Sequence, residues 1–254
     1  DDVYTYEAWE WAFAILFSRA INLRTTDTLA LVPYADLLNH SPYCVTYIDI
    51  QPASWLKNGV VVQYSDRQYE RTQQVYVTYG PKSNGDLLLL YGFVVDRNPY
   101  DSVEITVALD PSDALYEKKK EFLEAGGTPL SVAFPLFADR YPKELIEFLR
   151  FCCATEEEME EDFGEFVSQR NEDEVAESLI AACKAALDGY PQTMEEDDAL
   201  VRDRGTYRLL SQNQRWALKH RRSEKRILRR AITNVERERA DPSYMFTFSS
   251  STAT

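Results

Sequence analysis

The sequence predicts an α+β protein: a small-stranded first part with a helical insert, then an all-α second part that begins near residue 111. Two observations predict this class. Short runs of β-branched and aromatic residues, separated by turn signals, fill residues 29–109, and apolar residues at helical spacing fill the chain beyond them. Strands and helices that are segregated along a chain favour an α+β fold or separate domains. A length of 254 residues lets either arrangement bury a core.

The first element is a predicted helix over residues 4–22. Its apolar positions at three- and four-residue spacing are Trp9, Ala12, Phe13, Leu16 and Ala20. Other apolar residues lie between these positions and leave almost no polar face, and a helix that is apolar all round is expected to be buried.

Short strands are predicted next, because the following apolar runs are brief and end at turn residues. The runs cover 29–34, 45–50, 60–64, 75–78 and 104–109. A short helix is predicted between the last two of them, over residues 82–91.

Helices alone are expected after residue 110. Their periodic patterns cover 113–125, 142–153, 173–187, 194–201 and 206–239. The end of the chain, 241–254, is expected to be a disordered tail, since its last residues are mainly Ser and Thr.

The overall composition excludes several classes of function. The formal charge is 28 − 42 = −14, which disfavours non-specific nucleic-acid binding. No apolar run of about 18 residues exists to predict a membrane span. The chain has four cysteines and only two histidines, with no metal-ligand spacing, so free thiols and no metal are expected. A monomer that binds neither nucleic acid nor membrane is the resulting expectation.

Charge is nevertheless segregated along the chain. Residues 156–165 hold seven acidic side chains, whereas residues 202–239 hold 13 Lys or Arg against four Asp or Glu. A solvated basic helix face that docks on the acidic segment is the favoured interpretation. A docking surface for an acidic protein is the alternative, and its contribution to binding would be sensitive to salt.

Two motifs carry the functional signal. Residues 36–41 read DLLNHS and contain one of the two histidines, and residues 79–85 read YGPKSNG, followed by YGF at 91–93. Taken alone, His40 fits a core histidine, and Tyr79 and Tyr91 fit ordinary strand-end and core tyrosines. Their order and spacing together favour a binding site.

With these motifs, the chain resembles the SET-domain lysine methyltransferases of the plant Rubisco large-subunit type. Further stretches that look like that family are AALDGY at 185–190, EEDD at 195–198 and RSEKRIL at 222–228. The resemblance covers nearly the whole chain. It implies a partial SET domain over residues 1–110 and a helical substrate-binding domain over 111–240.

By that resemblance, S-adenosyl-L-methionine is the cofactor. The backbone around Asn39 and His40 is expected to hold it, with contacts from Arg19 at the end of the first helix and from Tyr91. The family places a second Arg four residues after Arg19, where this chain has Leu23.

The resemblance also implies the substrate side of the site. Tyr79 is expected to be the catalytic channel tyrosine, with Tyr91 and Tyr47 as the wall around the target amine and Asp36 beside the substrate. Methyl transfer to an amine needs alignment of the acceptor more than acid–base chemistry. Tyrosines suit this task, since their faces attract an ammonium group and their hydroxyls orient a neutral amine.

The function expected from the sequence is therefore a protein-lysine N-methyltransferase that acts on a folded protein, such as the Rubisco large subunit or aldolase. A SET-family histidine methyltransferase is one alternative. The family also implies Gly-rich opening strands that do not precede Asp1, so a truncated chain is expected, and a non-catalytic protein-binding module is the other alternative. The resemblance implies a chloroplast location, with cytoplasm or nucleus as alternatives.

Overall fold

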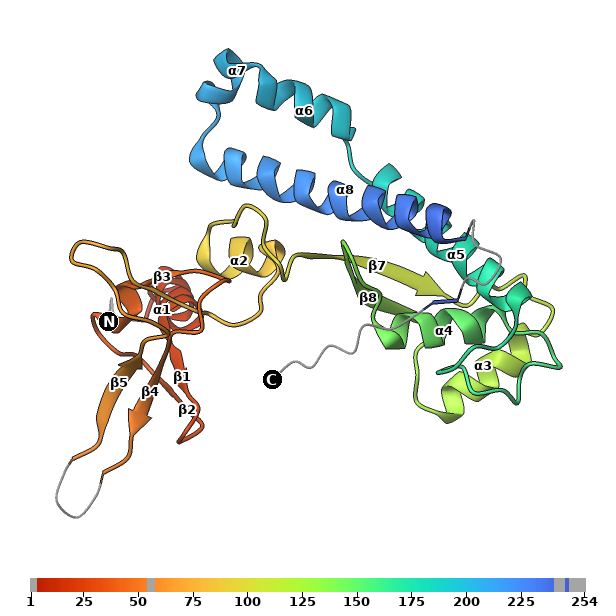
Figure 1. Ribbon diagram of the computed structural model, residues 1–254, viewed down its shortest axis with the longest axis horizontal. Helices are drawn as coiled ribbons and strands as arrows, with labels where there is room; N and C mark the ends of the chain where they lie inside the picture. Colours follow the sequence, from red (N-terminus) through yellow and green to blue (C-terminus); the bar gives the residue numbers. More distant parts are fainter. Residues whose placement is uncertain (1–3, 54–57, 240–244, 247–254) are drawn as a thin grey trace. The chain divides into compact units, whose positions relative to one another are not determined.

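The computed structural model describes residues 4–53, 58–239 and 245–246 (Figure 1). It divides into two compact units, Asp1–Tyr100 and Asp101–Thr254. The division falls before the boundary expected near residue 110, because the strand Ser102–Ala108 pairs with a strand of the second unit. Helices and short strands make up both units, which confirms the predicted α+β class.

The first unit consists of two helices and short paired strands. In chain order its elements are α1 (Tyr6–Arg19), β1 (Ile21–Leu23), β2 (Thr28–Ala30), a 3-10 turn η1 (Ala35–Leu37), β3 (Asn39–His40), β4 (Tyr47–Gln51), β5 (Val60–Tyr64), β6 (Tyr76–Val77) and α2 (Asn84–Tyr91). β1 pairs with β2 and β4 with β5, both antiparallel, whereas β3 and β6 are parallel. The four predicted runs in this unit contain strands, and β1 and β3 are additional.

The prediction that the first helix is buried was wrong. No residue of α1 is buried, and its Tyr6, Trp9, Phe13 and Phe17 side chains are each about half exposed or more. These four rings stack along the helix, with successive centroids 6.0, 5.1 and 4.4 Å apart. Apolar periodicity predicted the helix but did not predict what covers it.

The core of the first unit is small. Leu23 of β1, Ile48 of β4 and Val77 of β6 form its buried cluster. The buried Asp49 carboxylate accepts hydrogen bonds from the backbone N–H and hydroxyl of Thr25, which ties the β1–β2 turn to β4. The three short strand pairs are thereby held together next to η1.

The second unit contains one antiparallel strand pair and six helices in its described part. In chain order its elements are β7 (Ser102–Ala108), α3 (Tyr116–Ala125), β8 (Ser131–Phe137), α4 (Lys143–Cys153), α5 (Gln169–Asp188), α6 (Met194–Arg202), α7 (Arg204–Leu209) and α8 (Gln212–Glu238). In Figure 1, α5 and α8 run side by side, and α4 contacts β8 through the rings of Phe148 and Phe134.

The expectation of an all-α second part was therefore wrong, since β8 is a strand. This run contains Pro135, and proline is disfavoured within a strand because it cannot donate a backbone hydrogen bond. β8 pairs with β7 alone, with Glu104 opposite Pro135, so proline is tolerated at an open edge. The predicted helix over 206–239 is also divided, because Ser211 caps α8 in a capping box with Gln214.

Buried ion pairs connect the helices of the second unit. Arg150 of α4 pairs with Glu172 of α5 at 2.6 Å, and both side chains are almost fully buried. The other Glu172 oxygen accepts the backbone N–H of Phe246 at 2.8 Å. Within the predicted disordered tail, Phe246 is buried in the core and Met245 is exposed; the rest of 241–254 lies outside the described residues.

The basic helix α8 docks on acidic residues, but not on the segment that was expected. Asp197 of α6 pairs with Lys225 and Arg221, and further α6–α8 pairs join Asp198 to Arg222 and Glu195 to Arg229. The segment 156–165 instead contacts α5 and α3, through Glu158 to Arg170 and Glu156 to Lys118. The acidic EEDD stretch thus neutralises one side of α8.

The four cysteines are free thiols, as the sequence predicted. Within the described residues, no group of three or more His, Cys, Asp and Glu side chains is arranged to hold a metal ion. None of the described helices combines the length and the apolar character needed to span a membrane.

Candidate functional site

A pocket of about 290 Å³ in the first unit collects most of the predicted site residues. Its walls come from the end of α1, from β1, η1, β4 and β6, and from the last residue of α2. The predicted residues that line it are Arg19, Asp36, Tyr47, Tyr79 and Tyr91. Side chains up to 72 positions apart in sequence therefore meet around one hollow.

Tyr79 is fixed from both ends. It follows β6, and its backbone N–H donates to Nδ1 of His40 at 3.1 Å. Its hydroxyl donates to the Leu38 carbonyl at 2.6 Å. Gly80, with φ of +95°, then turns the chain away in a conformation that glycine adopts without strain. Burial raises the pKa of Tyr79, so its phenol is neutral at neutral pH.

Tyr91 forms the neighbouring wall, with its ring centroid 4.9 Å from that of Tyr79. It is the last residue of α2, which begins with a capping box between Ser83 and Asp86 and ends at Gly92 in the left-handed conformation. The buried Asn84 accepts the Val95 N–H at 2.9 Å, which ties the helix to the following loop. Burial also raises the pKa of Tyr91.

Arg19 and Asp36 form the charged side of the pocket. Arg19 Nη1 donates to the Asp36 carbonyl at 2.8 Å and lies 3.9 Å from its carboxylate. Both side chains stay partly exposed. Together with Tyr79 and Tyr91, this side of the pocket presents a guanidinium, a carboxylate and two phenols.

Asn39 and His40 do not line the pocket but form the strand beside it. In the parallel β3–β6 pair, Asn39 lies opposite Tyr76 and His40 opposite Val77. Asn39 is exposed, whereas His40 is buried and its ring stacks on Tyr79 with centroids 5.0 Å apart. The two predicted motifs are therefore in direct contact.

Tyr47 stands at the rim, where it stacks on Tyr64 across the β4–β5 pair with centroids 4.9 Å apart. Sequence reasoning missed Asn22, Arg24 and Thr78, which also line the pocket. Arg24 was not predicted because the family pattern points to the position of Leu23, and Leu23 is buried in the core. Arg24 is the first residue of the turn after β1, next to the position that the family pattern indicates.

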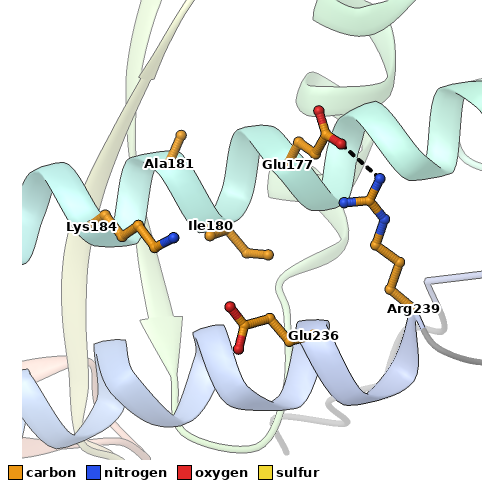
Figure 2. Close-up of a pocket in the computed structure, with 6 residues that line it drawn as sticks. All are labelled: Glu177, Ile180, Ala181, Lys184, Glu236 and Arg239. Atoms are coloured by element: carbon orange, nitrogen blue, oxygen red, sulfur yellow. Dashed lines mark hydrogen bonds and ion pairs between the residues drawn. The ribbon is translucent and has the colours of Figure 1, made fainter.

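A second, more open hollow lies in the second unit, between α5 and α8 (Figure 2). It has a volume of about 580 Å³, and its rim carries the ion pair between Glu177 and Arg239 at 2.7 Å. Lys184 and Glu236 project into it over Ile180. It holds no tyrosine, histidine or cysteine among the described residues that line it, so it lacks the groups that the first pocket brings together.

Comparisons with known proteins agree with this architecture. Residues 110–228 match the family model "Rubisco LSMT substrate-binding". The chain is 31% identical to the actin-histidine N-methyltransferases of Papio anubis and Homo sapiens, over 92% of its length and 41% of theirs. It thus spans about two fifths of these relatives.

Solved structures show the same resemblance. The SET domain of LSMT bound to lysine and AdoHcy superposes with a TM-score of 0.70 at 27% identity, over 94% of this chain and 57% of that one. Rubisco LSMT bound to AdoMet gives a TM-score of 0.67 at 27% identity, over 95% and 57%.

The fold and the pocket define a class: a small-stranded SET-type unit followed by a helical substrate-binding unit. The chain is similar to SET-domain methyltransferases, and its residues 110–228 match the Rubisco LSMT substrate-binding domain.

Proposed function

We propose that the chain is part of an S-adenosylmethionine-dependent protein N-methyltransferase that methylates a side-chain nitrogen of a folded protein. The observation that carries the proposal is the convergence of Arg19, Asp36, Tyr79 and Tyr91 on one partly enclosed pocket. The family's structural neighbours, which were solved with AdoMet or AdoHcy, support the same cofactor.

The residues of the pocket fit such a cofactor. The guanidinium of Arg19 suits a carboxylate, and the faces of Tyr79 and Tyr91 suit a sulfonium, since aromatic faces attract cations. S-adenosylmethionine, when bound, supplies an electrophilic methyl group. The strand β3, with Asn39 and His40, supplies backbone groups at the edge of the pocket for further contacts.

Tyr79 is the residue that orients the acceptor nitrogen. Its hydroxyl hydrogen is already donated to the Leu38 carbonyl, so the lone pairs of the phenol oxygen remain for an N–H of the substrate. The raised pKa keeps the phenol protonated and therefore keeps this arrangement at neutral pH. Alignment of an acceptor in this way can lower a barrier by roughly 7–11 kcal/mol.

We propose histidine as the acceptor, because the sequence relatives are actin-histidine methyltransferases at 31% identity. A neutral imidazole can donate one N–H to the Tyr79 oxygen and present its other nitrogen to the methyl group. Lysine, which the sequence predicted and which the 27%-identical LSMT structures support, is the competing acceptor.

The partner is proposed to be a folded protein that the second unit captures, in keeping with the match to a substrate-binding family model. Actin is the candidate that the relatives' name supplies, and the Rubisco large subunit and aldolase remain predictions. The relatives from Papio anubis and Homo sapiens are animal proteins and give no support to a chloroplast location.

The first experiment measures binding of S-adenosylmethionine to this chain by calorimetry, followed by methyl transfer to actin and to Rubisco with a radiolabelled methyl group. Hydrolysis and amino-acid analysis of the product then separate methylhistidine from methyllysine. Methylhistidine supports the proposed acceptor, and methyllysine replaces it with lysine. Absence of binding heat removes the enzymatic proposal for this chain and leaves the protein-binding module.

The second experiment tests the role of Tyr79 in the active form. Tyr79→Phe removes the oxygen that receives the acceptor N–H, so kcat is expected to fall by at least about tenfold while cofactor affinity changes little. Tyr76→Phe is the matched control, since Tyr76 lies on β6, the strand just before Tyr79, and its hydroxyl donates to Gln74 outside the pocket. Equal rates in the two variants would remove Tyr79 from this role.

A further inference from the structure

The side chain of His40 has a partner that the proposed chemistry does not explain. His40 lies on β3, the strand proposed to supply backbone contacts to the cofactor, yet the residue is only 8% exposed and does not line the pocket. Its Nδ1 accepts the backbone N–H of Tyr79 at 3.1 Å. No other side chain of the described residues is hydrogen-bonded to that backbone group.

The ring of His40 also supports the ring of Tyr79. The two planes are inclined by 27° with centroids 5.0 Å apart, and the ring of Phe93 lies 6.3 Å from His40 on another side. Tyr79 is thus held at its backbone and at one face by His40, and at its hydroxyl by Leu38, two residues before His40. The segment 38–40 alone fixes both ends of the tyrosine.

The hydrogen bond defines the protonation state of the imidazole. Nδ1 accepts, so in the neutral ring the proton is on Nε2, which has no hydrogen-bond partner of acceptable geometry among the described residues. Burial lowers the pKa of His40 and outweighs the opposing effect of the Val77 carbonyl, and the charge of Lys82 lowers the pKa further. Both effects favour the neutral acceptor at neutral pH.

We propose that His40 is a positioning residue for Tyr79. Its side chain couples β3, the strand proposed to contact the cofactor, to the Tyr79 phenol that orients the acceptor nitrogen. This inference rests on the proposed methyl transfer, but it assigns His40 a role distinct from cofactor contact. A displacement of the strand β3 is transmitted through the imidazole to Tyr79. The two motifs, 39 residues apart, therefore act as one unit.

Two substitutions separate positioning from packing. His40→Asn keeps an acceptor, because the Asn Oδ1 atom occupies nearly the place of the histidine Nδ1. His40→Phe keeps the ring and its stacking but cannot accept the Tyr79 N–H. If His40 positions Tyr79, kcat of the Phe variant falls by roughly tenfold or more, since small misplacements of a reacting group are costly. KM for S-adenosylmethionine stays near the wild-type value.

The ranking of the two variants by kcat decides the interpretation. A kcat for His40→Asn that is several-fold above that of His40→Phe supports positioning. Equal or higher activity of the Phe variant overturns it, because then apolar packing alone is what the site needs. A raised KM for S-adenosylmethionine with unchanged kcat also overturns it, since His40 would then act on cofactor binding.

A second readout does not depend on activity: NMR on the full chain measures the rate of hydrogen exchange of the Tyr79 amide. The amide is expected to stay protected in His40→Asn and to exchange faster in His40→Phe. With ¹⁵N-labelled histidine the chain gives only two imidazoles, and the signal lost in His40→Asn identifies His40.

An unprotonated Nδ1 at neutral pH, with a pKa below the ordinary value of about 6.5, is expected. If wild-type chain transfers no methyl group, the proposed function fails, and the amide exchange still decides the contact. Unchanged Tyr79 protection in the Phe variant overturns the inference.

Discussion

The two units of the chain stabilise themselves in different ways. In the part of the chain that the structure describes, the buried apolar cluster of the first unit has three members, whereas that of the second unit has 21. The first unit relies on hydrogen bonds and ring contacts such as His40 to Tyr79. The second adds ion pairs that are almost fully buried, Arg150 to Glu172 and Lys225 to Asp197.

This difference indicates that the first unit carries the specific contacts of the site, whereas the second unit carries most of the buried core. A pocket that has to admit a cofactor and a side chain cannot be filled by core residues, so polar contacts fix its tyrosines individually. The second unit presents a surface rather than a reacting group, and a large core makes it rigid. Changes in the core of the second unit are therefore expected to alter stability alone, and changes in the first unit to alter the site as well.

The largest expected effect comes from Arg150→Met. It leaves the carboxylate of Glu172 buried without its cation, which typically destabilises a protein by about 3–5 kcal/mol. Differential scanning calorimetry should show the transition of the second unit at a lower temperature and that of the first unit unchanged. Lys118→Met, in the exposed pair with Glu156, is the control and is expected to change stability by less than about 1 kcal/mol. A parallel shift of both transitions would show that the units do not unfold separately.

In the first unit, Gly80→Ala is expected to destabilise by about 1–2 kcal/mol, because φ of +95° is unfavourable for a residue with a Cβ atom. The strain lies one residue from Tyr79, so methyl transfer should fall with stability. Gly126→Ala, at φ of −82° in the second unit, is the control and should be near neutral. Chemical denaturation measures the stability, and the methyl-transfer assay measures the activity. Full activity with lowered stability would separate Gly80 from the site.

The two units are also expected to differ in how their stability depends on pH. Burial alone raises the pKa of Glu158, but hydrogen bonds from Ser168, Thr155 and Arg170 outweigh it and lower the pKa to about 2. A lowered carboxyl pKa stabilises the second unit above the ordinary value of about 4.5, and this stability is lost as pH falls from there through about 2. After the discount for solvent screening, Glu158→Gln should lower stability at pH 7 by about 1–2 kcal/mol and make little difference at about pH 2.

The first unit should respond to acid earlier. The pKa of His40 is also lowered, so its contribution to stability is complete above about 6.5 and decreases as pH falls below that value. Fluorescence and calorimetry between about pH 7 and pH 3 should therefore show weakening of the first unit before that of the second. Simultaneous weakening of the two units near about pH 6 would contradict this order.

Much of the fold follows from the sequence, because helix periodicity and capping are local. The pattern of residues 142–153 gave α4 almost to its ends, and that of 60–64 gave β5. Strand β8 was not predicted: it contains Pro135, which is tolerated only at an open edge, and its pairing with β7 cannot be read locally. The exposure of α1 was missed for a related reason: periodicity shows which face is apolar but not what lies against it.

The site could be predicted only as a set of residues. The motifs and the family resemblance together selected Tyr79, Tyr91 and Arg19, and the structure gathers these side chains around one pocket. Their hydrogen bonds were not predictable: the Tyr79 hydroxyl to Leu38 and the Tyr79 N–H to His40 depend on the parallel β3–β6 register, which two-residue strands do not specify by pattern. The roles of these residues in catalysis remain predictions.

The smallest effect compares the same helix cap in both units. Ser83 and Ser211 each form a capping box, and replacement of either by Ala is expected to destabilise by about 1 kcal/mol. The two substitutions should differ in how much of the helix they affect. α2 has eight residues and ends at Tyr91, and so short a helix depends on its cap. α8 has 27 residues and a continuous buried face, so only its first turn should fray.

Hydrogen exchange should therefore be faster throughout residues 87–91 in Ser83→Ala. In Ser211→Ala the amides of residues 227–235 should keep their wild-type protection. Movement of Tyr91 should also weaken its contact with Tyr79, so Ser83→Ala is expected to reduce methyl transfer more than its loss of stability explains, and Ser211→Ala is not. The opposite outcome is that both helices fray only at their first turns and that the two variants have equal activity. The site would then depend on the cap of α2 no more than the second unit depends on the cap of α8. The two units would differ only in the size of their cores.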